Sequence, residues 1–519
     1  MVSTVAVAVA DREVVGFRSF LAFFAMVVGM FLAVLNIQIV GSSFADIQAG
    51  LAAGPDEISW VLTAALIAET IMIPLSGWLS RLMSTRILFT LSASGFAAAS
   101  LACAFAWDID SMIVFRALQG FSGGAMAPMV FATVYSVFPR RYQNVLIAIV
   151  SLLGTSAVAI GPSVGGWISE SLSWHWLFLI SVPFGVFSAI VVGFLVDFDR
   201  PDWKLARVID IPGIMLIAVF FMSLLTVLEE GRREDWFASD FILGLSAVTV
   251  ISGVLLLWRE LTAANPVVDL RVFANRNFAV GAFYICVFGA GLFVPLFLLP
   301  LFLARIEGLN TAQIGSMLFV LGLAMMFAGF IVPFLLRIMR RRTVATMGFA
   351  LLALGTLAQA NLNEDTAFYE LLLPQVLRGF AGQLCFLPMI GLAIGLLPAE
   401  QVKNATGLFQ LTMRLGGAVG VAVANSYLVI RSQVNYAQIR DMIAIGGPLD
   451  AITVDRFSSL FAPLAGAGPG GGQAGLDMLV RLSERDAVTH AFNEITTVVA
   501  IAIAMLTVFL PFAARGREG

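Results

Sequence analysis

Long apolar runs dominate the chain between residues 17 and 513, and charged residues, prolines, glycines or polar clusters separate one run from the next. A helix needs about 20 apolar residues to cross the hydrocarbon core of a bilayer. Fourteen runs meet that requirement, and each predicts a membrane-spanning helix. The predicted spans are, in chain order, Phe17–Val40, Ile58–Leu79, Ile87–Trp107, Ser111–Phe138, Asn144–Ile168, Trp176–Val196, Ile211–Leu228, Ser239–Trp258, Asn277–Phe302, Gln313–Leu336, Thr343–Ala360, Tyr369–Leu397, Asn404–Ile430 and Ala491–Ala513.

The composition of the 519 residues agrees with this pattern, because hydrophobic residues make up 60% of the chain and charged residues only 12%. A soluble protein carries about 25% charged residues. Too little polar surface is available to cover the molecule, so much of its exterior must face lipid. We therefore expect an all-α membrane protein, and we exclude a soluble enzyme, a disordered chain and a disulfide scaffold.

Charge and cysteine patterns give no indication of nucleic-acid, metal or catalytic chemistry. The net charge is -3 and the basic residues are dispersed, so the chain has no basic stripe that could follow a phosphate backbone. Its 3 cysteines and 2 histidines lie apart, without metal-ligand spacing. No cluster of Asp, His or Cys has acid–base spacing at membrane depth. We predict no cofactor, no metal, no catalytic residue and no nucleic-acid partner.

The distribution of basic residues predicts how the chain lies in the membrane. An even number of spans places both termini on one side, and short cytoplasmic loops carry an excess of Lys and Arg. Most of the 30 Lys and Arg residues fall on the side of the termini. We therefore expect both termini in the cytoplasm and the long loop 431–490 on the other side.

The loop 431–490 contains the glycine-rich run Gly466–Gly475. Such a run predicts a flexible segment in the middle of the loop. The first part, Gln433–Ile445, has the composition to extend the preceding helix beyond the membrane. Two interpretations stay open: the loop is a tolerated linker, or it is a docking surface for an extracytoplasmic partner.

A weak internal repeat divides the chain into two halves. Val114–Gly120 resembles Val376–Gly382 at an offset of 262 residues, and a Pro-Met pair follows each segment. The arginine-containing loops after spans two and ten recur at nearly the same offset. Two parallel repeats around an axis normal to the membrane are typical of one large transporter class, which binds substrate near the midplane between the repeats. The predicted units are a six-helix half over residues 1–200, an inserted helix pair over 201–265 and a second six-helix half over 266–519.

Charged residues inside membrane spans are expensive and are therefore functional candidates. Away from the ends of the spans we single out Glu69, Arg116, Arg378 and Arg414, and Glu69 is the carboxylate nearest the predicted midplane. A buried carboxylate near an arginine can load and release a proton, since burial favours its neutral form and the arginine its charged form. We predict proton coupling through Glu69 and Arg116, and leave open whether the two pair directly. The alternative is that Glu69 only holds two helices together.

Polar residues within the spans predict the wall of a substrate cavity. These residues are Asn36, Gln38, Gln119, Arg378, Gln383, Gln410 and Arg414. The chain also contains 43 Phe and 20 Met residues, and flexible surfaces of that kind repack around varied hydrophobic ligands. We expect transport of many hydrophobic or amphipathic small molecules. A transporter dedicated to one metabolite, lipid or siderophore is the alternative.

Span five carries small residues around a proline, namely Gly154, Gly161, Pro162, Gly165 and Gly166. Small residues allow close helix packing, and a proline removes a backbone hydrogen bond and bends the helix. A bent and tightly packed helix between two rocking halves could seal one side of the transport path. The alternative is an ordinary packing face.

The turn at the end of span two carries Gly77, Arg81 and Arg86 at the predicted cytoplasmic end of the helix. In one interpretation, the arginines only reflect the usual excess of positive charge in cytoplasmic loops. Alternatively, they contact acidic groups or helix C-termini when a cytoplasmic gate closes.

These motifs together resemble the major facilitator superfamily, and in particular its fourteen-helix drug:proton antiporters of the EmrB and QacA type. Gly77–Arg86 is similar to the family's loop motif, although Arg81 and Ser84 replace its usual Asp and Gly. Arg116–Gly124 is similar to the motif of span four, whose arginine is associated with proton coupling. Ala157–Gly166 is similar to the antiporter motif of span five, with Ala157 in place of its first glycine. The resemblance implies a major facilitator fold and export of compounds in exchange for protons.

Two further features refine the resemblance. Asn36 stands where the family usually carries an aspartate in span one, which leaves Glu69 as the expected proton carrier. The stretch Asp46–Trp60 looks most like the EmrB-like branch. Members of that branch lie in the bacterial inner membrane and work with a periplasmic adaptor protein and an outer-membrane channel. The resemblance therefore implies these partners, with antibiotic resistance as a consequence of efflux.

Overall fold

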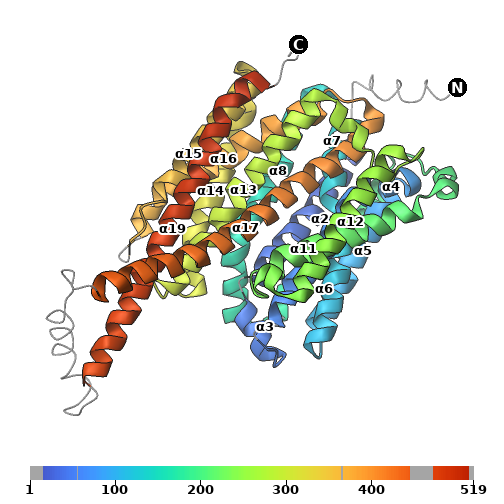
Figure 1. The fold of residues 1–519 in the computed structure, drawn as a ribbon. Helices are drawn as coiled ribbons and strands as arrows, with labels where there is room; N and C mark the ends of the chain where they lie inside the picture. Colours follow the sequence, from blue (N-terminus) through green and yellow to red (C-terminus); the bar gives the residue numbers. More distant parts are fainter. Residues whose placement is uncertain are drawn as a thin grey trace.

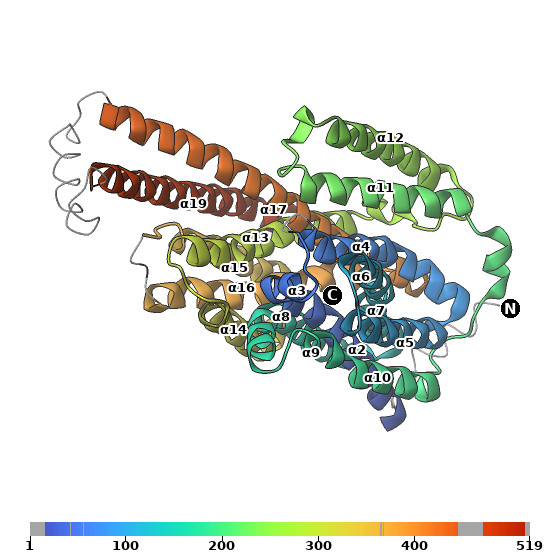
Figure 2. The same cartoon turned by 90° about the horizontal axis from the view of Figure 1, so that it is seen from below.

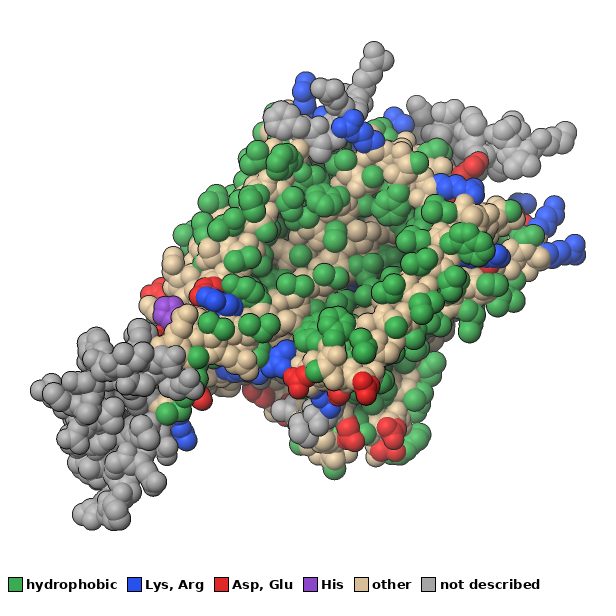
Figure 3. All heavy atoms as spheres, viewed as in Figure 1, with side chains coloured by type: hydrophobic (Ala, Val, Ile, Leu, Met, Phe, Trp, Pro, Cys, Tyr) green, Lys and Arg blue, Asp and Glu red, His purple; other side chains and the backbone are tan. Residues whose placement is uncertain are grey.

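The computed structural model describes residues 16–41, 43–54, 57–363, 366, 368–444 and 471–513. Within these residues all regular structure is helical, which confirms the predicted all-α membrane fold, and Figure 1 shows the long helices side by side. Hydrophobic side chains cover the middle of the face in Figure 3, while Lys and Arg are concentrated along its upper edge and Asp and Glu along its lower edge. This distribution is expected of a protein that crosses a bilayer.

The N-terminal half contains the six spans predicted for it. Its helices are α2 (Phe17–Gly41), α3 (Phe44–Gly50), α4 (Ile58–Met83), α5 (Thr85–Ala104), α6 (Ile109–Gly124), α7 (Met126–Val137), α8 (Arg140–Ser171), α9 (Trp176–Leu179) and α10 (Ser181–Leu195). The fourth predicted span is divided into α6 and α7 at Ala125, and the sixth into α9 and α10 at Ile180. A capping box begins α6, because the Asp108 carboxylate accepts a hydrogen bond from the Ser111 backbone at 2.8 Å.

The inserted pair consists of α11 (Ile211–Glu230) and α12 (Asp240–Thr262), accompanied by the short 3-10 helices η1 (Trp203–Val208), η2 (Trp236–Ala238) and η3 (Leu270–Ala274). α11 packs against α4 and α17, whereas α12 packs mainly against α11 (Figure 2). Few side chains of α12 are buried, so in a bilayer this helix faces lipid. Arg259 and Asp210 form an ion pair of 3.0 Å that joins the two helices at one end.

The C-terminal half contains α13 (Arg276–Arg305), α14 (Thr311–Ile338), α15 (Arg341–Ala358), α16 (Phe368–Ile394), α17 (Ala399–Ala444) and α19 (Gly471–Ala513). Each predicted span thus has a helical counterpart. Within the described residues, 11 helices are individually long and apolar enough to cross a membrane, and the bent helix α8 raises the number to 12. Spans four and eleven do not meet that criterion, because α6 and α7 are separate short helices and two arginines lower the hydropathy of α15.

The two ends of the helix bundle can be told apart by the helices that begin or end there. α2 begins and α19 ends at one end, which we call the terminal side, and the opposite end beside α3 is the distal side (Figure 1). The halves meet mainly where α4 and α7 pack against α17 and where α8 packs against α14 and α16. Residues on these helices can therefore respond to a relative movement of the halves.

α17 and α19 extend past the other helices at the distal side as an antiparallel pair (Figures 1 and 2). Arg431 of α17 contacts the carboxylate of Glu494 on α19 at 2.6 and 2.9 Å. Asn435 donates to the Ala487 carbonyl at 3.4 Å. We call this pair beyond Arg431 the distal projection.

The distal projection corrects the prediction that residues 431–490 form a loop. α17 continues to Ala444, as expected for Gln433–Ile445, and α19 begins at Gly471, inside the glycine-rich run. The described ends of the segment are therefore helical. Of the run Gly466–Gly475, which was predicted to be flexible, residues 466–470 lie outside the described residues and residues 471–475 belong to α19, in contrast to the prediction.

Candidate functional site

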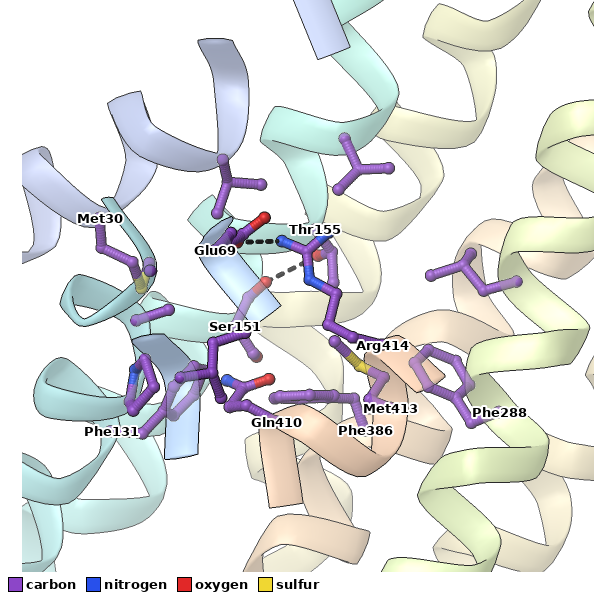
Figure 4. A pocket seen from close by; sticks show the side chains of 18 of the residues that line it. Met30, Glu69, Phe131, Ser151, Thr155, Phe288, Phe386, Gln410, Met413 and Arg414 are labelled. Atoms are coloured by element: carbon purple, nitrogen blue, oxygen red, sulfur yellow. Dashed lines mark hydrogen bonds and ion pairs between the residues drawn. The ribbon is translucent and has the colours of Figure 1, made fainter. Parts of the chain in front are cut away.

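An ion pair between the two halves lies in the middle of the bundle. Nη2 of Arg414 on α17 donates to Oε1 of Glu69 on α4 at 2.9 Å (Figure 4). Only 11% of the Glu69 side chain and 18% of the Arg414 side chain are exposed. Each half thus contributes one largely buried charge, and removal of either partner would leave the other uncompensated.

A central cavity of about 660 Å³, including its opening, surrounds this ion pair and has helices of both halves in its wall. Most of the wall is apolar, and the rings of Phe131 and Phe386 approach each other across the halves with centroids 5.6 Å apart (Figure 4). Ser151 and Gln410 add polar groups. An apolar cavity with a few polar groups is typical of a small-molecule binding site.

Arg116 does not pair with Glu69 but organises a polar network within the N-terminal half. Its Nη1 donates to the side-chain oxygen of Asn36 at 2.7 Å and to that of Gln119, and its Nε donates to the Val61 carbonyl at 3.1 Å. All of these side chains are buried. The guanidinium therefore ties α6 to both α2 and α4.

A small cavity separates this network from the ion pair. Glu69, Arg116, Asn36 and Gln119 all line it. Nη2 of Arg116 is buried and has no hydrogen-bond partner among the described residues. The two residues predicted to couple protons are thus not in contact, but they face the same polar space.

Two glycines of α6 explain how a charged network fits between closely packed helices. A Cβ atom on Gly120 would lie 2.1 Å from the Ala65 carbonyl oxygen, and one on Gly124 would lie 2.7 Å from that of Glu69. Only glycine allows this approach without displacing the backbone. The span-four motif therefore places Arg116 and Glu69 on neighbouring helices at short range.

The predicted cavity residues occupy different environments. Gln410 and Arg414 line the central cavity, and Asn36 and Gln119 line the small cavity. Gln38 lines a third cavity on the distal side, which Arg414 also reaches. These five residues therefore line cavities, but three adjoining cavities and not one.

Gln383 and Arg378 are buried and line none of these three cavities, in contrast to the prediction. The Gln383 amide accepts from Ser151 and donates to Thr155, both at 2.7 Å, so it is used in a link between the halves. Arg378 donates to Gln359 at 2.7 Å within the C-terminal half. Arg378 thus contacts a residue at the end of α15 in its own half, just as Arg116 contacts residues of its own half.

The small residues of span five lie on α8, which bends by 47° between Val158 and Ile160. Pro162 cannot donate a hydrogen bond to Val158, four residues earlier, so the bend lies where the helical hydrogen bond is missing. Gly154, Gly161, Gly165 and Gly166 belong to the same helix, and Gly161 allows it to contact α2. Beyond the bend, Ser163 donates to the Gly315 carbonyl of α14 at 2.6 Å, which brings the halves together at the distal side.

Gly77 lies where the halves meet at the terminal side, and a Cβ atom there would be 3.0 Å from the Asn404 Cα atom. Arg81 is partly buried beside it, and Arg86 is exposed. The latch by Arg81 and Arg86, one of the two interpretations of this turn, stays a prediction, and an ion pair between Lys403 and Asp199 joins the halves at this side.

Sequence reasoning missed Asp199 and Lys403, because charges at the ends of spans were attributed to the positive-inside rule. It also missed Ser151 and Thr155, which resemble ordinary small helix residues. The sequence around Ser151 and Thr155 gave no signal of a polar link, since their partner Gln383 lies in the other half.

Comparison with known proteins identifies the family. The family model of the Major Facilitator Superfamily matches residues 26–421. The chain belongs to the major facilitator superfamily. The colistin resistance protein EmrB of Acinetobacter baumannii is 34% identical over 96% of this chain and 96% of its own length. The multidrug export protein EmrB of Escherichia coli strain K12 is 29% identical, over 81% and 82%.

A solved structure agrees with the fold. The human organic anion transporter MFSD10 (TETRAN) matches with a TM-score of 0.56 and 12% identity, over 94% of this chain and 100% of that chain. This likeness concerns the fold alone. Together, the superfamily and the relatives confirm an EmrB-like, multi-pass membrane protein that is a transporter and not an enzyme.

Proposed function

We propose that the protein is a proton-driven exporter of hydrophobic and amphipathic compounds. The observation that carries the proposal is the Glu69–Arg414 pair, which joins the two halves inside the central cavity. The names of two relatives, a colistin resistance protein and a multidrug export protein, agree with such a role. No cofactor is needed, because the proton gradient supplies the energy.

Protonation of Glu69 provides the coupling step. Neutral Glu69 no longer compensates the charge of Arg414, so the contact between α4 and α17 weakens. The halves then rearrange around the cavity and expose it to the other side of the membrane. Loss of the proton restores the pair and the original arrangement.

The Arg116 network supports this step from the other side of Glu69. Its small cavity is of the size that one water molecule fills, and such a water would connect Glu69 with the polar groups of Arg116, Asn36 and Gln119. A proton could reach Glu69 by that route without entering the substrate cavity.

Reconstitution in liposomes tests the proposal. The wild type, Glu69→Gln and the control Asp240→Asn, an exposed position at the end of α12, are given a pH gradient with a fluorescent lipophilic cation or weak acid. We expect wild type and control to respond and Glu69→Gln to lose at least about 90% of the response, as expected for loss of a group needed in the coupled step. Equal transport by all three would place the proton path elsewhere, and no transport by any would refute proton-driven export of these probes.

We further propose that the terminal side faces the cytoplasm of a bacterial inner membrane. The concentration of Lys and Arg at that side supports this orientation (Figure 3). The distal projection would then extend into the periplasm and dock an adaptor protein that leads to an outer-membrane channel. Crosslinking from residues of α17 beyond Arg431, followed by copurification, tests the partner, and recovery of no adaptor would count against it.

A further inference from the structure

The third cavity lies between the inserted helix α11 and the interface of the two halves, and we call it the distal vestibule. It encloses about 810 Å³, including its opening, and has residues of α2, α4, α11, α13 and α17 in its wall. Phe293 and Arg414 line both the vestibule and the central cavity, so the two spaces adjoin. A compound that leaves the central cavity on the distal side would therefore meet the inserted helix.

The vestibule contains one unpaired carboxyl group. Most of its lining is apolar, and its charged residues are Arg414 and Glu229. Arg414 is already paired with Glu69 at 2.9 Å. Glu229 forms no ion pair or hydrogen bond with any described residue. The vestibule is therefore an apolar space with one unpaired carboxyl group at its wall.

The direction of Glu229 follows from its position on α11. Leu225, one helical turn earlier, also lines the vestibule, as expected for residues that share a helix face. The adjacent Glu230 is rotated away from this face: it is buried, contacts Arg233 at 3.1 Å and accepts from Ser59 of α4 at 3.4 Å. Glu230 thus attaches α11 to α4, which leaves Glu229 free for a ligand.

We propose that Glu229 is a substrate-binding residue that selects amphipathic cations, whose apolar part occupies the distal vestibule and whose positive group pairs with the Glu229 carboxylate. The inference rests on the proposed export function for its place in the cycle. It assigns the inserted helix pair a role in specificity, because neither six-helix half supplies this carboxylate. The vestibule volume lies within the range of about 300–1,000 Å³ that small-molecule sites occupy.

The Glu229 side chain is exposed and also lines the vestibule, so a ligand can reach its carboxylate. A ligand whose apolar part fills the vestibule displaces water from this contact, and an ionic hydrogen bond is stronger where fewer water molecules screen it. A neutral ligand of the same shape gains only the apolar contacts. The structure therefore predicts discrimination between charged and neutral forms of similar compounds.

Equilibrium binding to the purified full chain in detergent tests the inference without a proton gradient. The probes are tetraphenylphosphonium, as an amphipathic cation, and N-phenyl-1-naphthylamine, as a neutral compound. Glu229→Gln removes the charge, Glu229→Asp keeps it, and Glu234→Gln is the control, since Glu234 is an exposed carboxylate nearby that does not line the vestibule. Thermal unfolding of each variant verifies that the fold is intact.

We expect Glu229→Gln to raise the Kd for tetraphenylphosphonium by at least about tenfold, the size of a lost charge-assisted contact. Its Kd for the neutral probe should change by less than about twofold. Glu229→Asp should recover most of the cation affinity, and Glu234→Gln should bind both probes as the wild type does. Unchanged cation affinity in Glu229→Gln, equal loss for both probes, or no binding of the cation to wild type would overturn the inference.

Transport by the same variants separates this inference from the proposed function. If wild-type liposomes fail to respond to a pH gradient while cation binding still depends on Glu229, proton-driven export is refuted and the binding site stands. If wild type transports both probes and Glu229→Gln has the same preference between the cation and the neutral probe as wild type, the exporter stands and the role of Glu229 is refuted.

Discussion

Asp199 of the N-terminal half and Lys403 of the C-terminal half form an ion pair at the terminal side. Asp199 also accepts hydrogen bonds from the Thr85 backbone and hydroxyl, both at 2.9 Å, so the same carboxylate caps the start of α5. Lys403 further donates to the Ser80 carbonyl at 3.3 Å. These contacts join the end of α4, the start of α5, the segment after α10 and the start of α17. The terminal side is therefore held closed by residues from both halves.

Replacement of Lys403 by Gln should open the terminal side more often. The pair is partly exposed, so its loss should shift the equilibrium between the closed and the open terminal side by about 1 kcal/mol or less, which is up to about fivefold. The readout is the labelling rate of a cysteine introduced at Ala127, which lines the central cavity, by an impermeant thiol reagent added from the terminal side. Arg86→Gln, at an exposed position, is the control. Equal labelling rates in Lys403→Gln and wild type would show that the Lys403–Asp199 pair does not hold the terminal side closed.

The Glu69–Arg414 pair should show strong energetic coupling. Arg414→Gln leaves a largely buried carboxylate without its partner and should lower the free energy of unfolding by about 3 kcal/mol. Glu69→Gln keeps a hydrogen-bonding group and should cost less. The double variant should recover part of the loss, because it removes both charges.

A double-mutant cycle, measured by unfolding in mixed micelles, isolates this coupling. Asp240→Asn combined with Arg414→Gln is the matched control, since Asp240 is exposed and lies on α12. That pair should be additive within about 0.5 kcal/mol. Additive effects of the Glu69 and Arg414 substitutions would show that the observed contact carries no net interaction.

Arg116→Lys should be damaging although it keeps the charge. A lysine cannot replace the three directed hydrogen bonds to Asn36, Gln119 and the Val61 carbonyl. We expect a loss of about 2 kcal/mol in the free energy of unfolding, because buried acceptors are left without donors. Arg337→Lys, which changes an arginine in the last turn of α14, serves as the comparison and should change stability by less than about 0.5 kcal/mol. Equal effects of the two substitutions would show that the hydrogen bonds of Arg116 do not contribute to stability as expected.

The sequence predicted the helices well because bilayer thickness and apolar run length are local properties. It also predicted that Arg116 and Arg378 correspond, and each is buried with a glutamine partner in its own half. The same repeat gave no indication that Arg116 faces a cavity shared with Glu69 while Arg378 lines none of the three cavities. That difference depends on how neighbouring helices pack, which the repeat does not encode.

The partner of Glu69 could not be found from the sequence for a related reason. The sequence allows the depths of two residues to be compared only within one half, and Arg116 is the arginine of the same half as Glu69. Arg414 lies 345 residues away on a helix of the other half, so its approach depends on how the halves dock. The role of Asp199 was hidden in the same way, because its partner Lys403 comes from the opposite half.

Two glycines of α8 should respond oppositely to the same substitution. A Cβ atom on Gly161 would lie 2.3 Å from the Gln38 Cβ atom of α2, whereas one on Gly154 would have only the Met30 side chain nearby, at 3.8 Å. Gly161→Ala should therefore force α2 and α8 apart and lower the free energy of unfolding by about 2 kcal/mol. Gly154→Ala should raise it by up to about 1 kcal/mol, because alanine favours the helix. Unfolding in mixed micelles measures both, and destabilisation of equal size by the two substitutions would show that contact with α2 does not explain the requirement for glycine at position 161.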